Sequence, residues 1–579
     1  MRRLLGYLLR YRWRYSAGAA CLLLTASLAM AVPYLLKRAI DAVGHGAAAG
    51  QVTTYACWIV LIAIVQAVAR TCSRALIFNV GRDVEYDLRN DLFAHLQRLP
   101  VAYYQEQQTG DLMSRLINDV TAVRMLLGPG MLNLINTPVY YAYGIAIMFA
   151  LDARLTLAAL LPYPLLLVVA RGFGRRLMEH TLRVQQGLAD MSSRVQENLS
   201  GMHVVRAYAA EVRETAAFAA LNERFKDDSM RLARVRGQMM PVMKTAASLG
   251  TLVVLWYGGV GVIHGRLSLG DLVAFIAYLN LLAWPTMALG WMLSILQRGR
   301  AAMSRLEHIF AAPPSIADVS EPLALPAVHG RVEFRDVDFA YRTSDNGHQV
   351  LDRISLRVEP GQMLALVGRT GAGKSTIAML LPRLFDVGGG RILLDGHDIR
   401  AWPLAQLRRS IGFVPQDPFL FSTTVRQNIS FGRDDASDAD VWQAAAAAGV
   451  ADDIASFPRR YDTIVGERGI TLSGGQKQRL TLARAILTNP RILVLDDALS
   501  SVDVRTERTI LAALEEVMRD RTSIIIAHRI STIQRADLIA VIEDGHIVEL
   551  GDHAALLARD GLYAALFRQQ HLEEELGEL

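Results

Sequence analysis

The stretch Met363-Leu-Ala-Leu-Val-Gly-Arg-Thr-Gly-Ala-Gly-Lys-Ser-Thr376 decides the fold of the second half of this chain. It contains an apolar run, Met363–Val367, that is typical of a buried strand, followed by the pattern G-x-x-x-x-G-K-S over Gly368–Ser375 and then by an apolar helix. Glycines in such a loop let backbone amides surround phosphate groups, and the following helix start adds a partial positive charge. The context therefore predicts a nucleotide-binding α/β domain.

The loop residues are expected to divide the contacts with a nucleotide. Lys374 is expected to neutralise the β- and γ-phosphates, and Ser375 to ligate Mg²⁺. The loop alone would also fit a glycine-rich turn without a ligand, but further motifs follow it. The nucleotide-binding residues predicted here are Gly368, Arg369, Thr370, Gly371, Ala372, Gly373, Lys374, Ser375 and Thr376.

A second acidic motif lies in Arg491-Ile-Leu-Val-Leu-Asp-Asp-Ala-Leu-Ser-Ser-Val-Asp503. Asp496 follows the apolar run Ile492–Leu495, and a carboxylate at the end of a buried strand suits Mg²⁺ held through water. The alternative is that this side chain caps a helix. ATP and Mg²⁺ are therefore the predicted cofactors, with Ser375 and Asp496 as metal ligands.

Short β-rich runs alternate with helical runs from Arg331 onward, which indicates an α/β sheet domain. The segment 311–326 before it holds four prolines and little periodicity, so it is predicted to be a linker. The predicted domains are a membrane domain over 1–310, a linker over 311–330 and a nucleotide-binding domain over 331–579.

The first half of the chain is rich in apolar stretches without Asp, Glu, Lys or Arg. A membrane-spanning helix needs about 20 such residues, so six spans are predicted, the fourth of them short enough to be a buried soluble helix instead. The six stretches are Tyr15–Leu36, Gln51–Ala69, Met125–Leu151, Leu155–Ala170, Thr245–Ile263 and Leu272–Gln297.

Composition agrees with membrane-embedded mass and excludes other classes. Hydrophobic residues make up 52% of the chain and charged residues 20%. The net charge of +5 is small for 579 residues and does not indicate nucleic-acid binding. The three cysteines, Cys21, Cys57 and Cys72, are expected to be buried thiols and not a disulfide framework.

The connections between the predicted spans differ in length and charge. Those over 70–124 and 171–244 are long and rich in Arg, and they are expected to be helical extensions of the spans. The excess of positive charge predicts that they lie in the cytoplasm together with both termini. Lys37 and Arg38, after the first span, run against this rule.

A third motif, Leu472-Ser-Gly-Gly-Gln476, completes a set that resembles the ATP-binding cassette (ABC) transporters. The segments Val465–Gly469 and Tyr103–Asp119 resemble the exporters of that family, in which a short helix before Thr109 touches the ATPase domain. The resemblance covers essentially the whole chain. It implies an α-helical membrane domain of six transmembrane helices with long cytoplasmic extensions, joined to an α/β P-loop ATP-binding cassette domain, in the inner (plasma) membrane.

The resemblance also implies roles for single residues. Gln416, in Val-Pro-Gln-Asp, corresponds to the glutamine that reaches the metal. His528 corresponds to the histidine that contacts the γ-phosphate, and Tyr341 to the aromatic that stacks on adenine, although either residue could be structural instead. The motif residues Ser473, Gly474, Gly475 and Gln476 are implied to close over the nucleotide held by the opposite subunit.

Asp497 departs from the family, which normally has glutamate there as the base that activates the attacking water. Asp497, His528 and Gln416 are the implied catalytic residues. Because aspartate is one methylene shorter, the chain's own ATP site is expected to be impaired, which favours a heterodimer with a second half-transporter. A homodimer with slow hydrolysis and an ATP-gated channel or sensor are the alternatives.

The expected activity is ATP-driven export or flipping of amphipathic molecules such as drugs, lipids or peptides across the lipid bilayer. Aromatic and Met residues could line an apolar cavity for such cargo, or could equally be anchors at the membrane interface or parts of the core. These residues are Tyr140, Tyr141, Tyr143, Trp256, Trp284, Met287 and Trp291.

Overall fold

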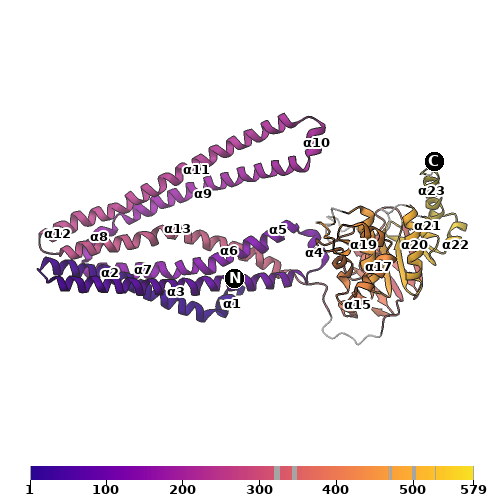
Figure 1. Cartoon of the computed structure of the whole chain (residues 1–579), viewed down its shortest axis with the longest axis horizontal. Helices are drawn as coiled ribbons and strands as arrows, with labels where there is room; N and C mark the ends of the chain where they lie inside the picture. The colour runs from indigo at the N-terminus through magenta and orange to yellow at the C-terminus, as the bar shows by residue number, and fades with distance from the viewer. Residues whose placement is uncertain are drawn as a thin grey trace. The chain divides into compact units, whose positions relative to one another are not determined.

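The computed structural model describes residues 2–318, 327–341, 349–466, 469, 472–498, 504–527 and 530–577. The chain forms two compact units, which are described separately (Figure 1). One unit comprises Met1–Ala94 and Gly110–Ala311, and the other comprises His95–Thr109 and Ala312–Leu579. The domain bounds of 1–310, 311–330 and 331–579 stay a prediction. They include residues 95–109 in the membrane domain, whereas the structure groups these residues with the second unit.

The first unit is helical in the part of the chain that the structure describes. Three short π-helical turns, η1, η2 and η3, interrupt its helices. Its elements are α1 (Arg2–Arg10), α2 (Arg12–Gly44), α3 (Ala49–Leu96), α5 (Thr109–Ser114), η1 (Arg115–Asp119), α6 (Val120–Met125), η2 (Leu126–Gly130), α7 (Met131–Leu151), α8 (Ala153–Leu160), α9 (Tyr163–Ser200), α10 (Met202–Ala207), α11 (Glu211–Val253), η3 (Val254–Gly258), α12 (Gly259–Ile263) and α13 (Leu269–Ala311).

Four helical stretches among the described residues are long and apolar enough to cross a membrane: Arg12–Gly44, Ala49–Leu96, Thr109–Leu151 and Glu211–Ile263. The stretch Leu269–Ala283 at the start of α13 is apolar but shorter. The number of six spans therefore stays a prediction. The expected fourth span is divided between α8 and α9 at Pro162, which has no N–H to continue the hydrogen bonds of α8.

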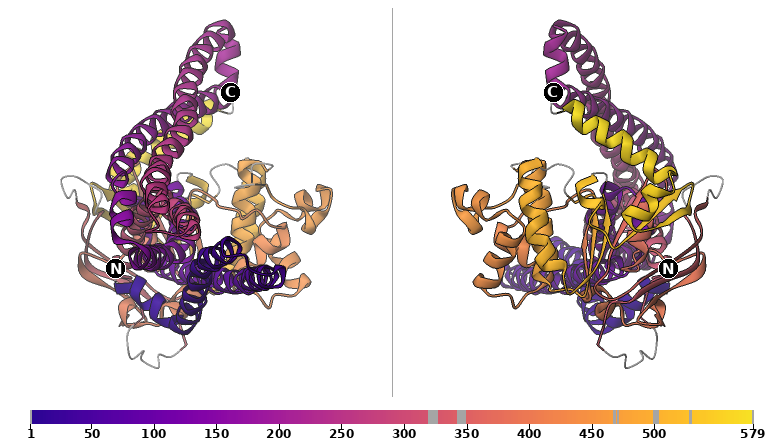
Figure 2. Two further views of the ribbon diagram at one scale, coloured as in Figure 1. Left: turned by 90° about the vertical axis from the view of Figure 1, so that its left-hand side faces the viewer. Right: turned by 90° about the vertical axis from the view of Figure 1, so that its right-hand side faces the viewer.

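The long connections of the first unit are helical, as predicted. Helices α9 and α11 lie side by side far beyond the apolar stretches, with α10 at their end (Figures 1 and 2). The cysteines are free, as expected, but the prediction that all are buried is wrong. Cys57 and Cys72 are exposed on α3. Because α3 is apolar enough to cross a membrane, side chains on its surface can face lipid instead of a protein core.

The N-terminal helices are fixed to α3 by acidic residues spaced four apart. Asp83, Asp87 and Asp91 lie on one face of α3, because a spacing of four returns to the same side of a helix. Tyr7 donates to Asp91 over 2.6 Å and Tyr11 donates to Asp87 over 2.9 Å. Two arginines of the same segment, Arg10 and Arg14, pair with Asp87 and Asp83.

Lys37 has an acidic partner at the start of α13. Its ammonium lies 2.6 Å from Oδ1 of Asp271, and the two side chains are 21% and 14% exposed. Asp41 accepts a hydrogen bond from the backbone N–H of Gly270 over 3.0 Å. The last turns of α2 are thus joined to the first turn of α13 by an ion pair whose partial burial makes each charge dependent on the other.

The described residues of the second unit form two sheets. The smaller has the order β2-β1-β4-β5 and the larger the order β10-β9-β3-β8-β7-β6, in which only β10 pairs antiparallel. The predicted strands are confirmed. The strands are β1 (Val332–Ala340), β2 (Gln349–Val358), β3 (Met363–Gly368), β4 (Gly389–Leu394), β5 (His397–Asp398), β6 (Ile411–Val414), β7 (Ile492–Asp496), β8 (Thr522–Ile526), β9 (Leu538–Glu543) and β10 (His546–Gly551).

Helices surround these sheets and add a second core. One buried cluster lies on the sheets around Phe334 and Trp402, and another packs α17 and α19 together through Val441, Leu480 and Leu482. The helical elements are α4 (Val101–Glu106), α14 (Lys374–Leu380), η4 (Ile399–Ala401), α15 (Leu404–Arg409), α16 (Val425–Ile429), η5 (Ser430–Gly432), α17 (Asp438–Ala447), α18 (Ala451–Ser456), η6 (Arg460–Asp462), α19 (Gly474–Leu487), α20 (Val504–Met518), α21 (Ile530–Ile533), α22 (His553–Ala558) and α23 (Leu562–Gly577).

The first residues of the predicted linker are held against the second unit. Arg383 donates to the carbonyl of Ala317 over 3.4 Å, and the backbone N–H of Leu404 donates to Asp318 over 2.6 Å. Residues 319–326 of that linker lie outside the described residues.

The pair Lys37–Asp271 yields a test of how α2 and α13 are held together. Replacing Lys37 by Met leaves Asp271 as an unpaired, largely buried carboxylate, so we expect the stability of the protein in detergent to fall by about 1–3 kcal/mol. Thermal unfolding of the purified protein measures this. In the double variant K37M/D271N neither side chain carries a charge, so the loss should be smaller than the sum of the two single losses.

The matched control is Arg38→Met, since Arg38 is exposed and its side chain contacts Tyr34 of the same helix. That variant should unfold at nearly the wild-type temperature. Equal losses for Lys37→Met and Arg38→Met would show that the contact to α13 contributes nothing.

Candidate functional site

The phosphate loop connects β3 to α14 and adopts a backbone that suits glycine. Gly371 and Gly373 have φ values of +87° and +102°, a region that side chains other than glycine rarely adopt. A Cβ on Gly373 would also meet the side chain of Leu351 and the carbonyl of Val350. Because glycine has no Cβ at these positions, the backbone amides of the loop can come close to a bound group.

Lys374 is the buried cation of this loop. Its side chain is 6% exposed, and Nζ donates to the carbonyls of Gly368 and Arg369 over 2.8 and 2.9 Å. Burial lowers the pKa of Lys374, and the negative charges of Asp496 and Asp497 oppose that shift. Phosphate groups brought into the loop would add further negative charge beside Nζ and so favour its charged form.

Ser375 and Asp496 meet at the end of the sheet. The Ser375 hydroxyl donates to Oδ1 of Asp496 over 3.0 Å. A hydroxyl and a carboxylate in contact form a donor set that fits Mg²⁺, which binds through one or two protein oxygens and otherwise through water and phosphate. Among the described residues, no group of three or more His, Cys, Asp or Glu side chains is placed so that it could hold a metal ion. The donor set of Ser375 and Asp496 therefore fits a metal ion that phosphate groups also bind. It does not fit a metal ion enclosed by protein ligands alone.

A cavity of about 370 Å³ brings most of the predicted site residues together. The predicted residues that line it are Tyr341, Thr370, Gly371, Gly373, Lys374, Ser375, Thr376, Gln416, Asp496 and Asp497. Gly368 and Arg369 contribute carbonyls to Lys374 instead, and Ala372 is buried in the core beneath the loop. His528 lies outside the described residues.

Two residues that line this cavity belong to none of the motifs found in the sequence. Val350 lies in β2, and Ile526 ends β8 between the strands that carry the loop and Asp496. An apolar residue at a strand end has no chemical signature, so only the sheet order reveals that Ile526 reaches the site.

Asp497 follows β7 with an unusual backbone. Its φ is +48°, the left-handed region that aspartate visits more readily than most residues because its short side chain can bond locally. The backbone N–H of Asp497 donates to the carbonyl of Ile526 over 2.9 Å. Asp497 lines the cavity together with Asp496, Lys374 and Gln416.

Tyr341 stands at the edge of the cavity with its ring held by two other aromatic rings. The ring centroids of Phe339 and Phe385 lie 4.9 and 5.5 Å from that of Tyr341, both nearly perpendicular to it. Its hydroxyl lies 3.1 Å from the Thr376 hydroxyl. The ring is therefore fixed in orientation and presents an aromatic surface beside the phosphate loop.

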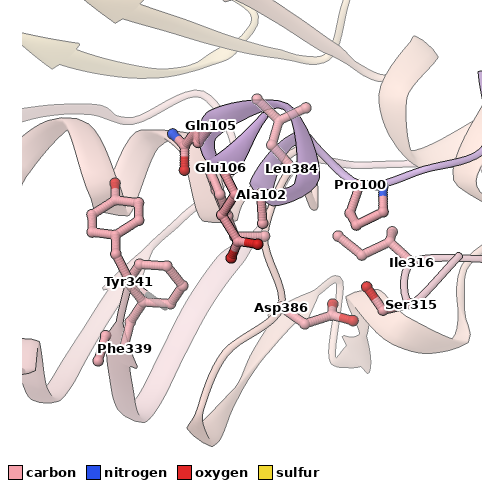
Figure 3. A pocket seen from close by; sticks show the side chains of 12 residues that line it. Pro100, Ala102, Gln105, Glu106, Ser315, Ile316, Phe339, Tyr341, Leu384 and Asp386 are labelled. Carbon is pink, nitrogen blue, oxygen red and sulfur yellow. The ribbon is translucent and has the colours of Figure 1, made fainter. Parts of the chain in front are cut away.

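A smaller cavity of about 250 Å³ lies next to Tyr341, beneath the short helix α4 (Figure 3). Figure 3 shows Ala102, Gln105 and Glu106 on this helix, above the strand that leads to Tyr341. Ala102 also packs against the core of the sheets. The expectation of a short helix before Thr109 that touches the ATPase domain is confirmed.

The motif Leu472–Gln476 forms the start of α19. Ser473 is the N-cap residue: its Oγ accepts from the backbone N–H of Gln476 over 3.2 Å, and Oε1 of Gln476 accepts from the backbone N–H of Ser473 over 3.0 Å. Ser473 and Gly474 are exposed. None of Ser473–Gln476 is among the described residues that line the cavity of the phosphate loop.

The helical unit has a cavity of its own, of about 520 Å³. It is mostly apolar, with Met30, Tyr34, Tyr143 and Tyr278 among its lining residues. Tyr143 is thus the one expected cargo residue found in this lining. Tyr140 and Tyr141 pack on a core cluster, Trp256 and Trp291 are exposed, and the side chains of Trp284 and Met287 lie outside the described part of the chain.

A P-loop nucleotide site on an α/β sheet, joined in one chain to a bundle of long apolar helices, defines a membrane protein that binds ATP. Comparison with known families agrees: residues 16–286 match the ABC transporter transmembrane region, and residues 351–500 match the ABC transporter family.

Comparison with single proteins gives the same result over the full length. The chain is 38% identical to the multidrug resistance-like ATP-binding protein MdlA of Escherichia coli, over 99% of this chain and 97% of the relative. It is 34% identical to the ATP-dependent lipid A-core flippase of Syntrophus aciditrophicus, over 98% and 93%. The structure of a bacterial Atm1-family ABC exporter with ATP bound superimposes with a TM-score of 0.80 at 32% identity, covering 96% and 98%. The chain belongs to the ABC transporters and is an exporter of that family.

Tyr341 yields a test of the adenine side of the site. If its ring stacks on the base, Tyr341→Ala should weaken ATP binding by about 5- to 100-fold, the usual range for losing one aromatic–base contact. Tyr341→Phe keeps the ring and removes the hydroxyl that contacts Thr376, so affinity should stay near the wild-type value. Equilibrium binding of a fluorescent ATP analogue to the purified transporter measures both. Equal weakening by both variants would assign the effect to the hydroxyl and not to stacking.

Proposed function

We propose that this chain is one half of a heterodimeric exporter that moves amphipathic molecules across the inner membrane, and that its own ATP site hydrolyses slowly. The observation that carries the proposal is Asp497, which lines the nucleotide cavity at the position where the family has glutamate. The other expected groups of the site line the same cavity: Lys374, Ser375, Gln416 and Asp496. The site is therefore built to hold ATP and Mg²⁺ while its base is short.

The residues of the site would act as follows. Lys374 neutralises the β- and γ-phosphates, and the loop amides surround them. Ser375, Asp496 and Gln416 hold Mg²⁺, which offsets phosphate charge during hydrolysis. Asp497 faces the water beside the γ-phosphate, but its carboxylate is one methylene further away than a glutamate would be. Because proton transfer requires hydrogen-bond reach, a misplaced base costs about 10²–10⁴ in rate.

The Leu472–Gln476 motif is proposed to serve the nucleotide of the opposite subunit. Ser473 and Gly474 in its N-terminal turn are exposed, and the exposed start of a helix is a place where an anion can bind. Two unequal sites follow: this chain's phosphate loop forms the slow site, and its motif completes a fast site whose glutamate lies on the partner. His528 is proposed to contact the γ-phosphate of the slow site.

Closure of two ATPase domains over ATP would swing the membrane helices outward and release cargo on the far side, a rigid-body change between two states. The proposed orientation places both termini and the connections 70–124 and 171–244 in the cytoplasm. Drugs, lipids or peptides are the proposed cargo classes, since the relatives are named for multidrug resistance and for lipid flipping. The apolar cavity beside Tyr143 and Tyr278 suits such molecules.

A homodimer with slow hydrolysis is the second candidate. It is favoured by one observation: Asp497 keeps a carboxylate in the nucleotide cavity, so some general-base activity remains chemically available. The two candidates differ in what they require. A homodimer transports when this chain is the only half-transporter in the membrane, whereas the heterodimer does not.

Substitutions in the phosphate loop and in the motif should differ in kind. Ser473→Ala acts on the partner's nucleotide in the fast site and should remove most turnover of the heterodimer. Lys374→Ala acts on the slow site and should spare more of it. Steady-state ATP hydrolysis by the co-purified complex measures both, and ATP binding to each chain confirms that Lys374→Ala empties only one site. The reverse order of effects would exchange the two sites.

Asp497→Glu restores the missing methylene and is the sharpest test. With the other groups in place, ATP hydrolysis at this site should rise by about 10-fold or more, toward the 10²–10⁴ that a well-placed base supplies. The gain has a cost in stability of about 1 kcal/mol, because glutamate tolerates the positive φ of residue 497 less well than aspartate. Single-turnover hydrolysis and thermal unfolding measure the two effects separately.

The control for this experiment is Asp497→Asn, which keeps the size and the backbone preference but removes the base. It should leave ATP binding unchanged and lower the residual hydrolysis of this site. The test should be repeated with an intact motif on the partner, since a degenerate partner motif would hide the gain. No gain from Asp497→Glu opposite an intact motif would mean that residue 497 does not limit this site.

A further inference from the structure

We propose that Asp453 is a positioning residue for the Leu472–Gln476 motif, holding Gln476 and Arg479 so that Ser473 faces the nucleotide of the opposite subunit. The inference rests on the proposed function, because it takes the motif to act on that nucleotide. Asp453 lies in the first turn of α18 and belongs to none of the motifs recognised in the sequence.

The Asp453 carboxylate uses its two oxygens for two residues of α19. Nε2 of Gln476 donates to Oδ1 over 2.9 Å, and the guanidinium of Arg479 lies 2.8 Å from Oδ2. Gln476 and Arg479 are three apart and therefore lie on one face of the helix. Arg479 and Asp453 are 12% and 24% exposed, and Arg479 also donates to the carbonyl of Gly449 over 2.6 Å. This partly buried contact fixes the rotation of the first turn of α19.

The side-chain amide of Gln476 links the Asp453 carboxylate to Ser473. One end of this amide donates to Asp453 and the other accepts from the backbone N–H of Ser473. Because both ends have a matching partner, the orientation of the amide is determined. The Ser473 oxygen accepts from the backbone N–H of Gln476, and a hydroxyl that accepts one bond can still donate its own proton. Asp453 thus sets the direction in which Ser473 can donate.

Another helix start in this chain offers an internal comparison. Thr424 and Gln427 form the same type of capping box at α16, and the bonds that the structure gives the Gln427 side chain and backbone there return to Thr424. A capping box therefore forms without a carboxylate behind its glutamine. The additional anchor at α19 is a feature of the helix that must present its first turn to a ligand.

The first test compares Asp453→Ala with Asp452→Ala, a control at the exposed neighbouring carboxylate of α18. In the full transporter, reconstituted with its partner half in lipid nanodiscs, Asp453→Ala should lower kcat for ATP hydrolysis by about 10- to 100-fold, as expected for a misplaced catalytic group. The KM for ATP and the binding of ATP to this chain's own phosphate loop should stay near wild type. Asp452→Ala should change none of these quantities.

The second test exchanges the amide and the carboxylate. Gln476→Glu alone places two carboxylates against each other and should lower kcat. In the double variant Q476E/D453N, the glutamate accepts from both Ser473 and the new amide, while the amide oxygen faces Arg479. Turnover should rise above that of Gln476→Glu alone, since the hydrogen-bond pattern is restored with reversed roles. If Asp453 had only a structural role, the double variant would regain the wild-type unfolding temperature but would not regain kcat.

The outcomes separate this inference from the proposed function. Ser473→Ala is run beside the Asp453 variants, and Ser473→Ala/Asp453→Ala should be no slower than Ser473→Ala, because both act through one hydroxyl. If Ser473→Ala leaves turnover unchanged, the proposed role of the motif fails. If Ser473→Ala is slow and Asp453→Ala is as fast as wild type, the role of Asp453 alone is overturned. If Asp453→Ala misfolds, the exchange variant still decides between positioning and structure.

Discussion

The register of three parallel strands is the constraint on which the nucleotide site depends. In β8, Ile526 pairs with Leu366 of β3 on one side and with Asp496 of β7 on the other. The phosphate loop and the carboxylate of Asp496 therefore leave the sheet at the same level, and Ser375 reaches Asp496 across the end of β8. Because side chains alternate between the faces of a strand, a slip of one residue in either pairing would turn Asp496 away from the loop.

The same unit carries a second, outward-facing half-site that depends on side chains and not on the sheet. The first turn of α19 is held by its own capping box and, behind it, by Asp453 and Arg479. The phosphate loop uses buried strands to place its groups, whereas the motif uses a charged contact near the surface. This difference would suit the proposed roles, because the loop would hold a nucleotide through the cycle while the motif would engage and release one each time the dimer closes.

Local patterns predicted the parts of this chain that depend on local physics. The loop Gly368–Ser375, the apolar strands and the helical connections follow from spacing along the sequence. The contacts Asp453–Gln476 and Lys37–Asp271 could not be predicted, because they join residues that only the tertiary fold brings together. The prediction that Cys57 is buried failed for another reason: in an apolar spanning helix, low polarity indicates contact with lipid as readily as contact with protein.

Two properties of Asp497 bear on the site: the reach of its side chain and the conformation of its backbone. The family's glutamate provides reach, but the backbone at this position has a positive φ that aspartate accepts at lower cost. A chain that relies on a partner for fast hydrolysis, as proposed, would not need the reach, and aspartate would keep the cost of this positive φ low. Bound nucleotide stabilises the folded ATPase domain, so the proposed slow hydrolysis and the lower backbone cost of aspartate would both favour the folded state. In the proposed heterodimer, the aspartate is the residue expected of a subunit that holds ATP, and hydrolysis would be left to its partner.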